Sequence, residues 1–174
     1  MTKTTASPVG HIGNGGVRPA STESVADILE RELDTTIHAW MELVEKEPEL
    51  SRIPLNYQER TGHLPKLLHD VIARLRLDKG TRAPISVAAG HHGDLRCKQG
   101  YTVANVVDES RILQVCIFTT LHKNTNRVEF SKLLPDVVII ADEVDAQLKQ
   151  QMLRFMAADA EKATESKYSL PANS

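Results

Sequence analysis

Side chains that can carry or exchange a proton gather in one stretch of this chain, residues 91–113, which reads HHGDLRCKQGYTVANVVDESRIL. His92 and Arg96 are four residues apart, so on a helix they share one face and can reach a common partner. Gly100 predicts a helix end in the left-handed conformation. Glu109, on the next helix, can then reach back across this corner to Arg96 or His92. The spacing therefore predicts a network of polar side chains where two helices meet.

This network has two compatible interpretations. Buried ionic groups persist only when they are paired, which favours an internal structural network over a ligand site. A network that can pair in more than one way is also a candidate two-state switch, because a ligand or a proton that favours one pairing shifts the helices. Arg111 follows Glu109 by two residues, about 200° of helix rotation, so it should serve a different contact, with another helix or a partner subunit. We expect Tyr101 to cover the joint.

The same residue types raise the alternatives of a metal site and of an enzyme. The candidate ligands are His63, His91, His92 and His122. No pair of them has the i,i+4 spacing of a helical zinc motif, and neither cysteine lies at ligand spacing from them, so we predict no metal and no cofactor. Nucleophile-elbow, phosphate-loop and kinase motifs are missing from the sequence. We therefore predict that the chain is not an enzyme, and that any kinase activity belongs to another domain or partner.

Composition narrows the class of partner and the compartment. The 174 residues carry 21 basic and 23 acidic side chains, a formal net charge of -2, which leaves no excess of positive charge for the phosphates of nucleic acid. Cys97 and Cys116 fall in segments that we expect to be helical, which fits free thiols in a reducing compartment. The sequence has no apolar run long enough to cross a bilayer and no leader-like apolar segment. We expect a cytoplasmic protein with no membrane partner.

The elements that must position the network have helical periodicity throughout. We expect helices over residues 21–47, 54–78 (in two parts), 84–99, 103–123 and 128–168, with a break or kink at Pro135. The helix over 103–123 is apolar on nearly every side and should be the central one. Glycine and proline in residues 1–21 predict a flexible arm. We expect residues 169–174 to form a disordered tail. The remainder, 22–168, is predicted to be one all-α helical bundle of about five or six helices with a long C-terminal helix.

Parts of the chain resemble the N-terminal domain family of the RsbT co-antagonist protein RsbRD, a module found ahead of bacterial signalling domains. One part is the pattern His-Gly-x-x-Arg, then Gln-Gly-Tyr-Thr, then Glu-x-Arg-x-Leu, in residues 92–113. A second part, similar to the family's Arg-x-x-His-Leu-Pro-x-Leu-Leu element, consists of Arg60, His63, Leu64, Pro65 and Leu68; residues 160–168 look like the family's closing helix. The chain departs from the family at His91, a second histidine, and at Ser110, where an aromatic residue is usual.

The resemblance implies a regulatory or sensory input domain of a bacterial signal-transduction system, of the histidine kinase or stressosome type. Such a domain would act through helix repacking and protein–protein contacts, as a homodimer, on a kinase or STAS-type protein or on its own downstream domain. The resemblance also admits a globin-like arrangement of the helices. Two alternatives stay open: a ligand- or haem-binding globin-like sensor, and an interaction scaffold that senses nothing. The candidate ligand-binding or switch residues are His63, His92, Arg96, Tyr101, Glu109 and Arg111.

Overall fold

The computed structural model describes residues 22–78, 80–81 and 84–168 of the chain. Its elements are α1 (Val25–Arg31), α2 (Leu33–Val44), α3 (Pro48–Ser51), α4 (Tyr57–Thr61), α5 (Leu64–Arg76), α6 (Val87–Lys98), α7 (Val103–Lys123), the 3-10 helix η1 (Thr125–Arg127) and α8 (Phe130–Tyr168). These described residues include no strand, so the predicted all-α class and long C-terminal helix are confirmed. The arm and the tail predicted for residues 1–21 and 169–174 lie outside the described residues.

The helices are shorter and more numerous than the periodicity predicted. The expected first helix is divided at Glu32, which closes α1 and opens α2 with a backbone conformation outside the helical region, at φ -95° and ψ 13°. This turn lets α1 pack on α5 while α2 packs mainly on α7. The buried residues of both helices recur at steps of three and four, as the periodicity predicted, and Trp40 is fully buried.

Side-chain caps fix where the two helices of the predicted corner begin. Ser86 accepts the backbone N–H of Ala89 at 3.0 Å and starts α6. Thr102 accepts the N–H of Asn105 at 3.2 Å, and the side chain of Asn105 accepts the N–H of Thr102 at 2.8 Å, a reciprocal cap that starts α7. Between them Gly100 has φ +81°, which only glycine adopts without strain. The predicted glycine corner is therefore confirmed.

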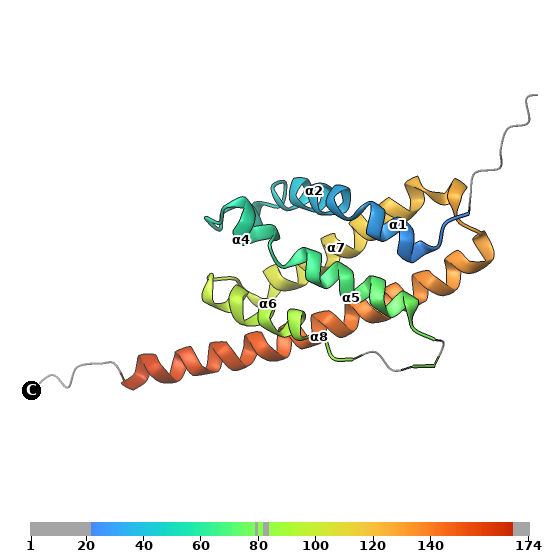
Figure 1. The fold of residues 1–174 in the computed structure, drawn as a ribbon. Helices are drawn as coiled ribbons and strands as arrows, with labels where there is room; N and C mark the ends of the chain where they lie inside the picture. The colour runs from blue at the N-terminus through green and yellow to red at the C-terminus, as the bar shows by residue number, and fades with distance from the viewer. Residues whose placement is uncertain (1–21, 79, 82–83, 169–174) are drawn as a thin grey trace, which may run out of the picture.

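Helix α7 packs on α1, α2 and α8, and in the view of Figure 1 it lies between α2 and α8. Its buried apolar residues include Val106, Ile117 and Leu121. One face is open, however, and exposes Val107 and Val115. The expectation that this helix is enclosed on nearly every side is thus wrong for that face, because no other described helix covers it.

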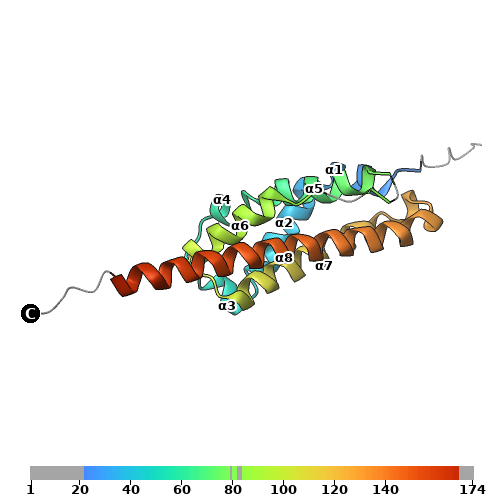
Figure 2. The ribbon, with the colours of Figure 1, turned by 90° about the horizontal axis from the view of Figure 1, so that it is seen from below.

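Helix α8 runs along the whole bundle and its last turns extend beyond it (Figures 1 and 2). It continues through Pro135 rather than breaking there. Its most extensive packing is against α6, where a Cβ built on Gly93 would lie 2.1 Å from the backbone oxygen of Gln151. Only glycine permits this approach of two helix backbones. Across the described residues, no helix pairs enough length with enough apolarity to traverse a lipid bilayer.

Candidate functional site

The core of the site is a buried ion pair between α6 and α7. Arg96 is 0 % exposed and Glu109 is 3 % exposed. The Nε of Arg96 donates to Oε2 of Glu109 at 2.9 Å, and its Nη2 donates to Oε1 at 3.0 Å. Two parallel charge-assisted bonds fix both side chains in one orientation. The Gly100 corner reverses the direction of the chain, and the side chain of Glu109 on α7 meets Arg96 on α6 as the spacing predicted.

The remaining donors of Arg96 tie α6 to α4. Nη1 donates to the backbone oxygen of Glu59 at 3.1 Å and to Oε1 of Gln99 at 2.7 Å. Nη2 also donates to the backbone oxygen of Arg60 at 2.9 Å. Both carbonyls belong to the short helix α4, whose last carbonyls have no partner within the helix. A single guanidinium thus joins three helices.

Two aromatic residues complete the surroundings of Glu109. The hydroxyl of Tyr101 donates to Oε1 of Glu109 at 2.7 Å, and the Arg96 guanidinium lies 4.7 Å from the centre of the Tyr101 ring, within reach of a cation–π interaction. Burial and the neighbouring carboxylate raise the pKa of Tyr101, so its hydroxyl keeps the proton that it donates. The indole Nε1 of Trp40 donates to the backbone oxygen of Glu109 at 3.1 Å. Tyr101 covers the joint, as predicted.

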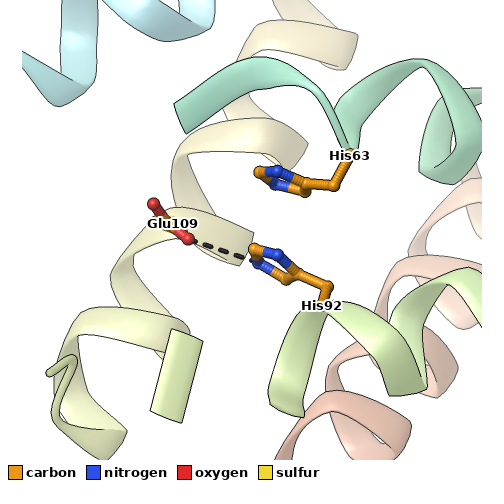
Figure 3. Close-up of side chains that lie close together, drawn as sticks. All are labelled: His63, His92 and Glu109. Carbon is orange, nitrogen blue, oxygen red and sulfur yellow. Dashed lines mark ion pairs between the residues drawn. The ribbon is translucent and has the colours of Figure 1, made fainter. Parts of the chain in front are cut away.

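Two histidines lie on the same side of Glu109 (Figure 3). Nε2 of His92, on α6, lies 3.3 Å from Oε2 of Glu109. The His92 ring stacks on His63, the residue that precedes α5, with 3.7 Å between ring centroids and 13° between planes. Trp40 meets His63 edge-on at 6.1 Å. Spacing along the sequence does not predict this stacking, because His63 and His92 belong to separate elements; His63 was named as a candidate metal ligand and through the family resemblance.

The charges of the cluster favour neutral histidines and an ionised glutamate. Burial lowers the pKa of His63 well below 6.5, and His92 and the Arg96 cation lower it further. Burial also lowers the pKa of His92, although Glu109 opposes this effect. Burial raises the pKa of Glu109, but bonds from His92 and the charge of Arg96 outweigh it and hold this pKa below 4.5. The Arg96–Glu109 pair is therefore charged and the rings beside it are neutral near pH 7.

Several buried nitrogens in this region lack a hydrogen-bond partner among the described residues: His63 Nδ1, His92 Nδ1 and Arg60 Nη1. With Nε2 at 3.3 Å from the Glu109 carboxylate, the tautomer of neutral His92 that suits this contact carries its proton on Nε2, which leaves Nδ1 as an acceptor with no donor. An unsatisfied buried polar atom costs about 1–3 kcal/mol. Both histidines line a groove of about 760 Å³ between α6 and the segment of α4 and α5.

Arg111 does not join the network, which corrects its inclusion among the candidate switch residues. Its side chain is 54 % exposed, and its Nη2 lies 3.2 Å from Oε1 of Glu47, in the turn between α2 and α3. Its Nε lies 3.5 Å from Asp108. The two-residue offset from Glu109 sends it to the opposite side of α7, as the rotation argument required. An exposed ion pair of this kind contributes at most about 1 kcal/mol.

Sequence reasoning missed the role of Arg60, a second buried cation. Arg60 is 4 % exposed, and its Nη2 donates to the backbone oxygens of Leu50, at 3.0 Å, and of Ile53. Its position in the family-like element was the available signal. Gln99, whose side chain accepts from Arg96, was missed as well, and nothing in its type or spacing pointed to it.

The structure also brings together three metal-ligand types that lie far apart in the sequence. Ligand atoms of His63, His92 and Glu109 all lie within 4.8 Å of one another, so the spacing argument against a metal site did not address this arrangement. The geometry gives a physical argument against a cation. Both Glu109 oxygens already accept bonds from Arg96, and stacked rings hold their nitrogen lone pairs parallel, whereas metal ligands converge on one point at about 2.0–2.1 Å. A divalent ion would also sit beside the Arg96 cation.

A scan with protein-family models finds no match to this chain, and searches of curated proteins and of solved structures find none either. The buried cluster and the groove beside it are therefore the features from which a function can be argued.

Proposed function

We propose that this chain is a regulatory or sensory input domain of a bacterial signal-transduction system, of the histidine kinase or stressosome type, which acts through helix repacking and protein–protein contacts. One observation carries the proposal: α6 contributes residues to the buried ionic cluster and is also the helix on which α8 packs most extensively, with a close backbone approach at Gly93. His92 and Arg96 reach the cluster, while Gly93, between them in sequence, touches the backbone of Gln151. A change in the pairing of the cluster moves the helix on which α8 packs.

Helix α8 is the element suited to deliver such a change. Arg154 of α8 pairs with Asp94 of α6 at 2.7 Å, and Lys162 donates to the backbone oxygen of Cys97 near the end of α6. The outer side chains from Asp159 to Ser166 are exposed. Because packed helices shift between discrete arrangements rather than deforming continuously, a small movement of α6 changes the direction of this exposed end. The partner would be a kinase or STAS-type protein, a downstream domain, or a second copy of the chain.

The cluster has the properties of a two-state element. A buried ion pair seldom adds net stability over apolar residues of the same volume, so a switching role is one reason to have it. The unpartnered nitrogens of His63 and His92 offer an alternative pairing to a ligand or a proton, which would favour one state of the helices. The resemblance to the RsbRD N-terminal domain family supplies the bacterial signalling context.

Hydrogen exchange tests the proposed coupling between the cluster and α8. The variants are Tyr101→Phe, which removes one bond to Glu109 and leaves the ion pair, and Glu109→Gln, which removes the charge. Neither residue belongs to α6 or α8. We expect faster amide exchange in residues 155–166 in both variants, and no change in Arg111→Gln, the matched control on the other side of α7. Faster exchange confined to α6 and α7, with α8 unchanged, would reject the coupling.

A genetic experiment tests the signalling assignment. In the source bacterium, the gene is deleted or replaced by the Tyr101→Phe or Arg111→Gln version. Stress-regulon transcripts and phosphorylated response regulators are then measured under heat, salt and acid. We expect the deletion and Tyr101→Phe to alter these outputs and Arg111→Gln to leave them unchanged. A deletion strain that responds like the wild type in every condition contradicts the assignment.

A further inference from the structure

The groove beside the two histidines has one apolar wall. Val87, His91 and Leu95 succeed one another at four-residue steps along α6 and line this wall. Val87 and Leu95 are both large apolar side chains left exposed to solvent. The opposite wall, from α4 and the start of α5, includes His63 and Lys66. An apolar surface that faces a few convergent polar groups is typical of sites for small organic molecules.

Among the polar groups that line the groove, Lys66 and Gln99 can donate a hydrogen bond to a ligand as they stand, and His63 can do so on protonation. Lys66 is exposed, and among the described residues it has no ion-pair partner. Gln99 uses its side-chain oxygen to accept from Arg96, which leaves its NH₂ as a donor. The acidic residue of the lining is Glu59, whose carboxylate accepts the backbone N–H of Asn56 at 2.8 Å in the cap of α4. The groove therefore offers these donors to a ligand that carries a hydrogen-bond acceptor.

The charges around the groove favour a negative ligand as well. Arg96 and Glu109 neutralise one another in their two-point ion pair. Glu59, the acidic residue of the lining, has its carboxylate held in the cap of α4. Lys66 is then the cation of the described lining, where it has no ion-pair partner. An anion supplies this partner, whereas a metal ion or an ammonium group is repelled by the lysine.

We infer that this groove binds a small organic carboxylate, with the carboxylate beside Lys66 and His63 and an apolar body against Val87 and Leu95. Lys66 follows His63 by three residues, so both side chains lie on one face at the start of α5. This inference rests on the proposed function, since it names the class of ligand that would bias the cluster. Binding also takes up a proton: a negative charge at the groove stabilises the protonated His63 ring, and the proton comes from solution. The charged or titratable groups around this ring are His91, His92, Arg96, Lys66, Glu59 and Glu109.

Calorimetry with two probe carboxylates, octanoate and 4-fluorobenzoate, tests the inference on the whole chain. 4-Fluorobenzyl alcohol and 4-fluorobenzylamine serve as the neutral and cationic analogues. We expect both carboxylates to bind, the alcohol and the amine to bind at least about tenfold more weakly, and the heat to depend on the ionisation enthalpy of the buffer because a proton is taken up. Failure of both carboxylates to bind at ~10 mM, or equal binding of the uncharged analogue, overturns the inference.

Two lysine variants test whether the carboxylates bind in this groove. Lys66→Gln should weaken binding about tenfold, which corresponds to about 1.4 kcal/mol, because it removes the exposed cation of the groove and disturbs no buried contact. Lys98→Gln is the matched control, an exposed lysine on α6 that does not line the groove. Equal weakening in both variants would mean attraction to general surface charge and would also overturn the inference.

Hydrogen exchange of α8 in the same samples separates this inference from the proposed function. If a carboxylate binds but amide exchange in residues 155–166 does not change, the ligand site is supported and transmission of a signal to α8 is contradicted. Absence of binding, together with faster exchange of α8 in Tyr101→Phe, rejects the ligand and retains the coupling.

Discussion

Arg96 and Glu109 form a two-point ion pair that is almost fully removed from solvent, with bonds of 2.9 and 3.0 Å. The two residues come from helices on either side of a glycine corner, and the guanidinium also holds two backbone oxygens of α4. The pair therefore links three elements that have few other reasons to keep their relative positions. The pair specifies how these three helices are arranged more than it adds to the free energy of unfolding.

Removing one partner should strongly destabilise the fold. Glu109→Gln leaves the Arg96 cation buried without a counter-charge, and loss of one partner of a buried pair costs about 3–5 kcal/mol. Urea unfolding followed by circular dichroism measures the free energy of unfolding. Arg111→Gln, which removes the partly exposed pair with Glu47, should change it by no more than about 0.5 kcal/mol. A Glu109→Gln variant as stable as the Arg111→Gln variant would contradict the role given to the pair.

Two glycine substitutions should separate steric contact from backbone strain. Gly93→Ala places a Cβ 2.1 Å from the backbone oxygen of Gln151, so the two helices must move apart, at a cost of about 3 kcal/mol or more. Gly100→Ala meets nothing within 4 Å but must adopt φ +81°, which costs about 1–2 kcal/mol. Thermal unfolding measures both. Equal effects of the two substitutions would show that the α6–α8 contact yields easily.

The sequence predicted the parts of the site that depend on local spacing. A four-residue step puts His92 and Arg96 on one face of α6, and Gly100 followed by Thr102 gives both the corner and the cap of the next helix. Those signals are enough to bring Glu109 back to Arg96. The rotation of two residues likewise separates Arg111 from Glu109, although Arg111 was still grouped with the network.

The parts that could not be predicted depend on packing between distant elements. The stacking of His63 on His92, 29 residues later in the sequence, follows from how α4 and α5 lie on α6, and no periodicity within one helix encodes it. The division of the first helix at Glu32 was missed because the apolar stripe continues on both sides of the turn. The open face of α7 was missed because Val107 and Val115 are apolar, which predicts burial, whereas no described helix covers them.

Cysteine labelling should report whether the bundle opens. Cys97 and Cys116 are free and buried, and burial raises the pKa of Cys116 to about 11. Because the thiolate is the reactive form, iodoacetamide at pH ~7.5 should leave both thiols unmodified in the folded protein and label both in urea. Mass spectrometry of the digested protein identifies the labelled positions. Rapid labelling of Cys116 without urea would mean that α7 is accessible in the folded state.

Acid should destabilise the fold through the two stacked histidines. The pKa values of His63 and His92 are lowered below 6.5 by burial, so in the folded state both rings stay neutral while in the unfolded chain they take up protons below that pH. Unfolding then consumes protons, and the free energy of unfolding falls as the pH drops below 6.5, by up to about 1.4 kcal/mol per pH unit for each histidine. The Glu109 carboxyl, with its lowered pKa, adds a loss at lower pH, once the pH falls below 4.5 and toward its folded-state pKa.

Urea unfolding at about pH 8, 7, 6 and 5.5 measures this dependence. A His63→Gln variant should lose about half of the slope between pH 6.5 and 5.5, since one of the two buried rings is removed. His91→Gln is the control, because His91 is exposed on the same helix as His92. Its replacement leaves the buried surroundings of His92 unchanged, so the slope should stay as in the wild type. The same slope in wild type and His63→Gln would show that His63 takes up protons as readily in the folded state as in the unfolded chain, and His92 alone would then couple protonation to the packing of α6.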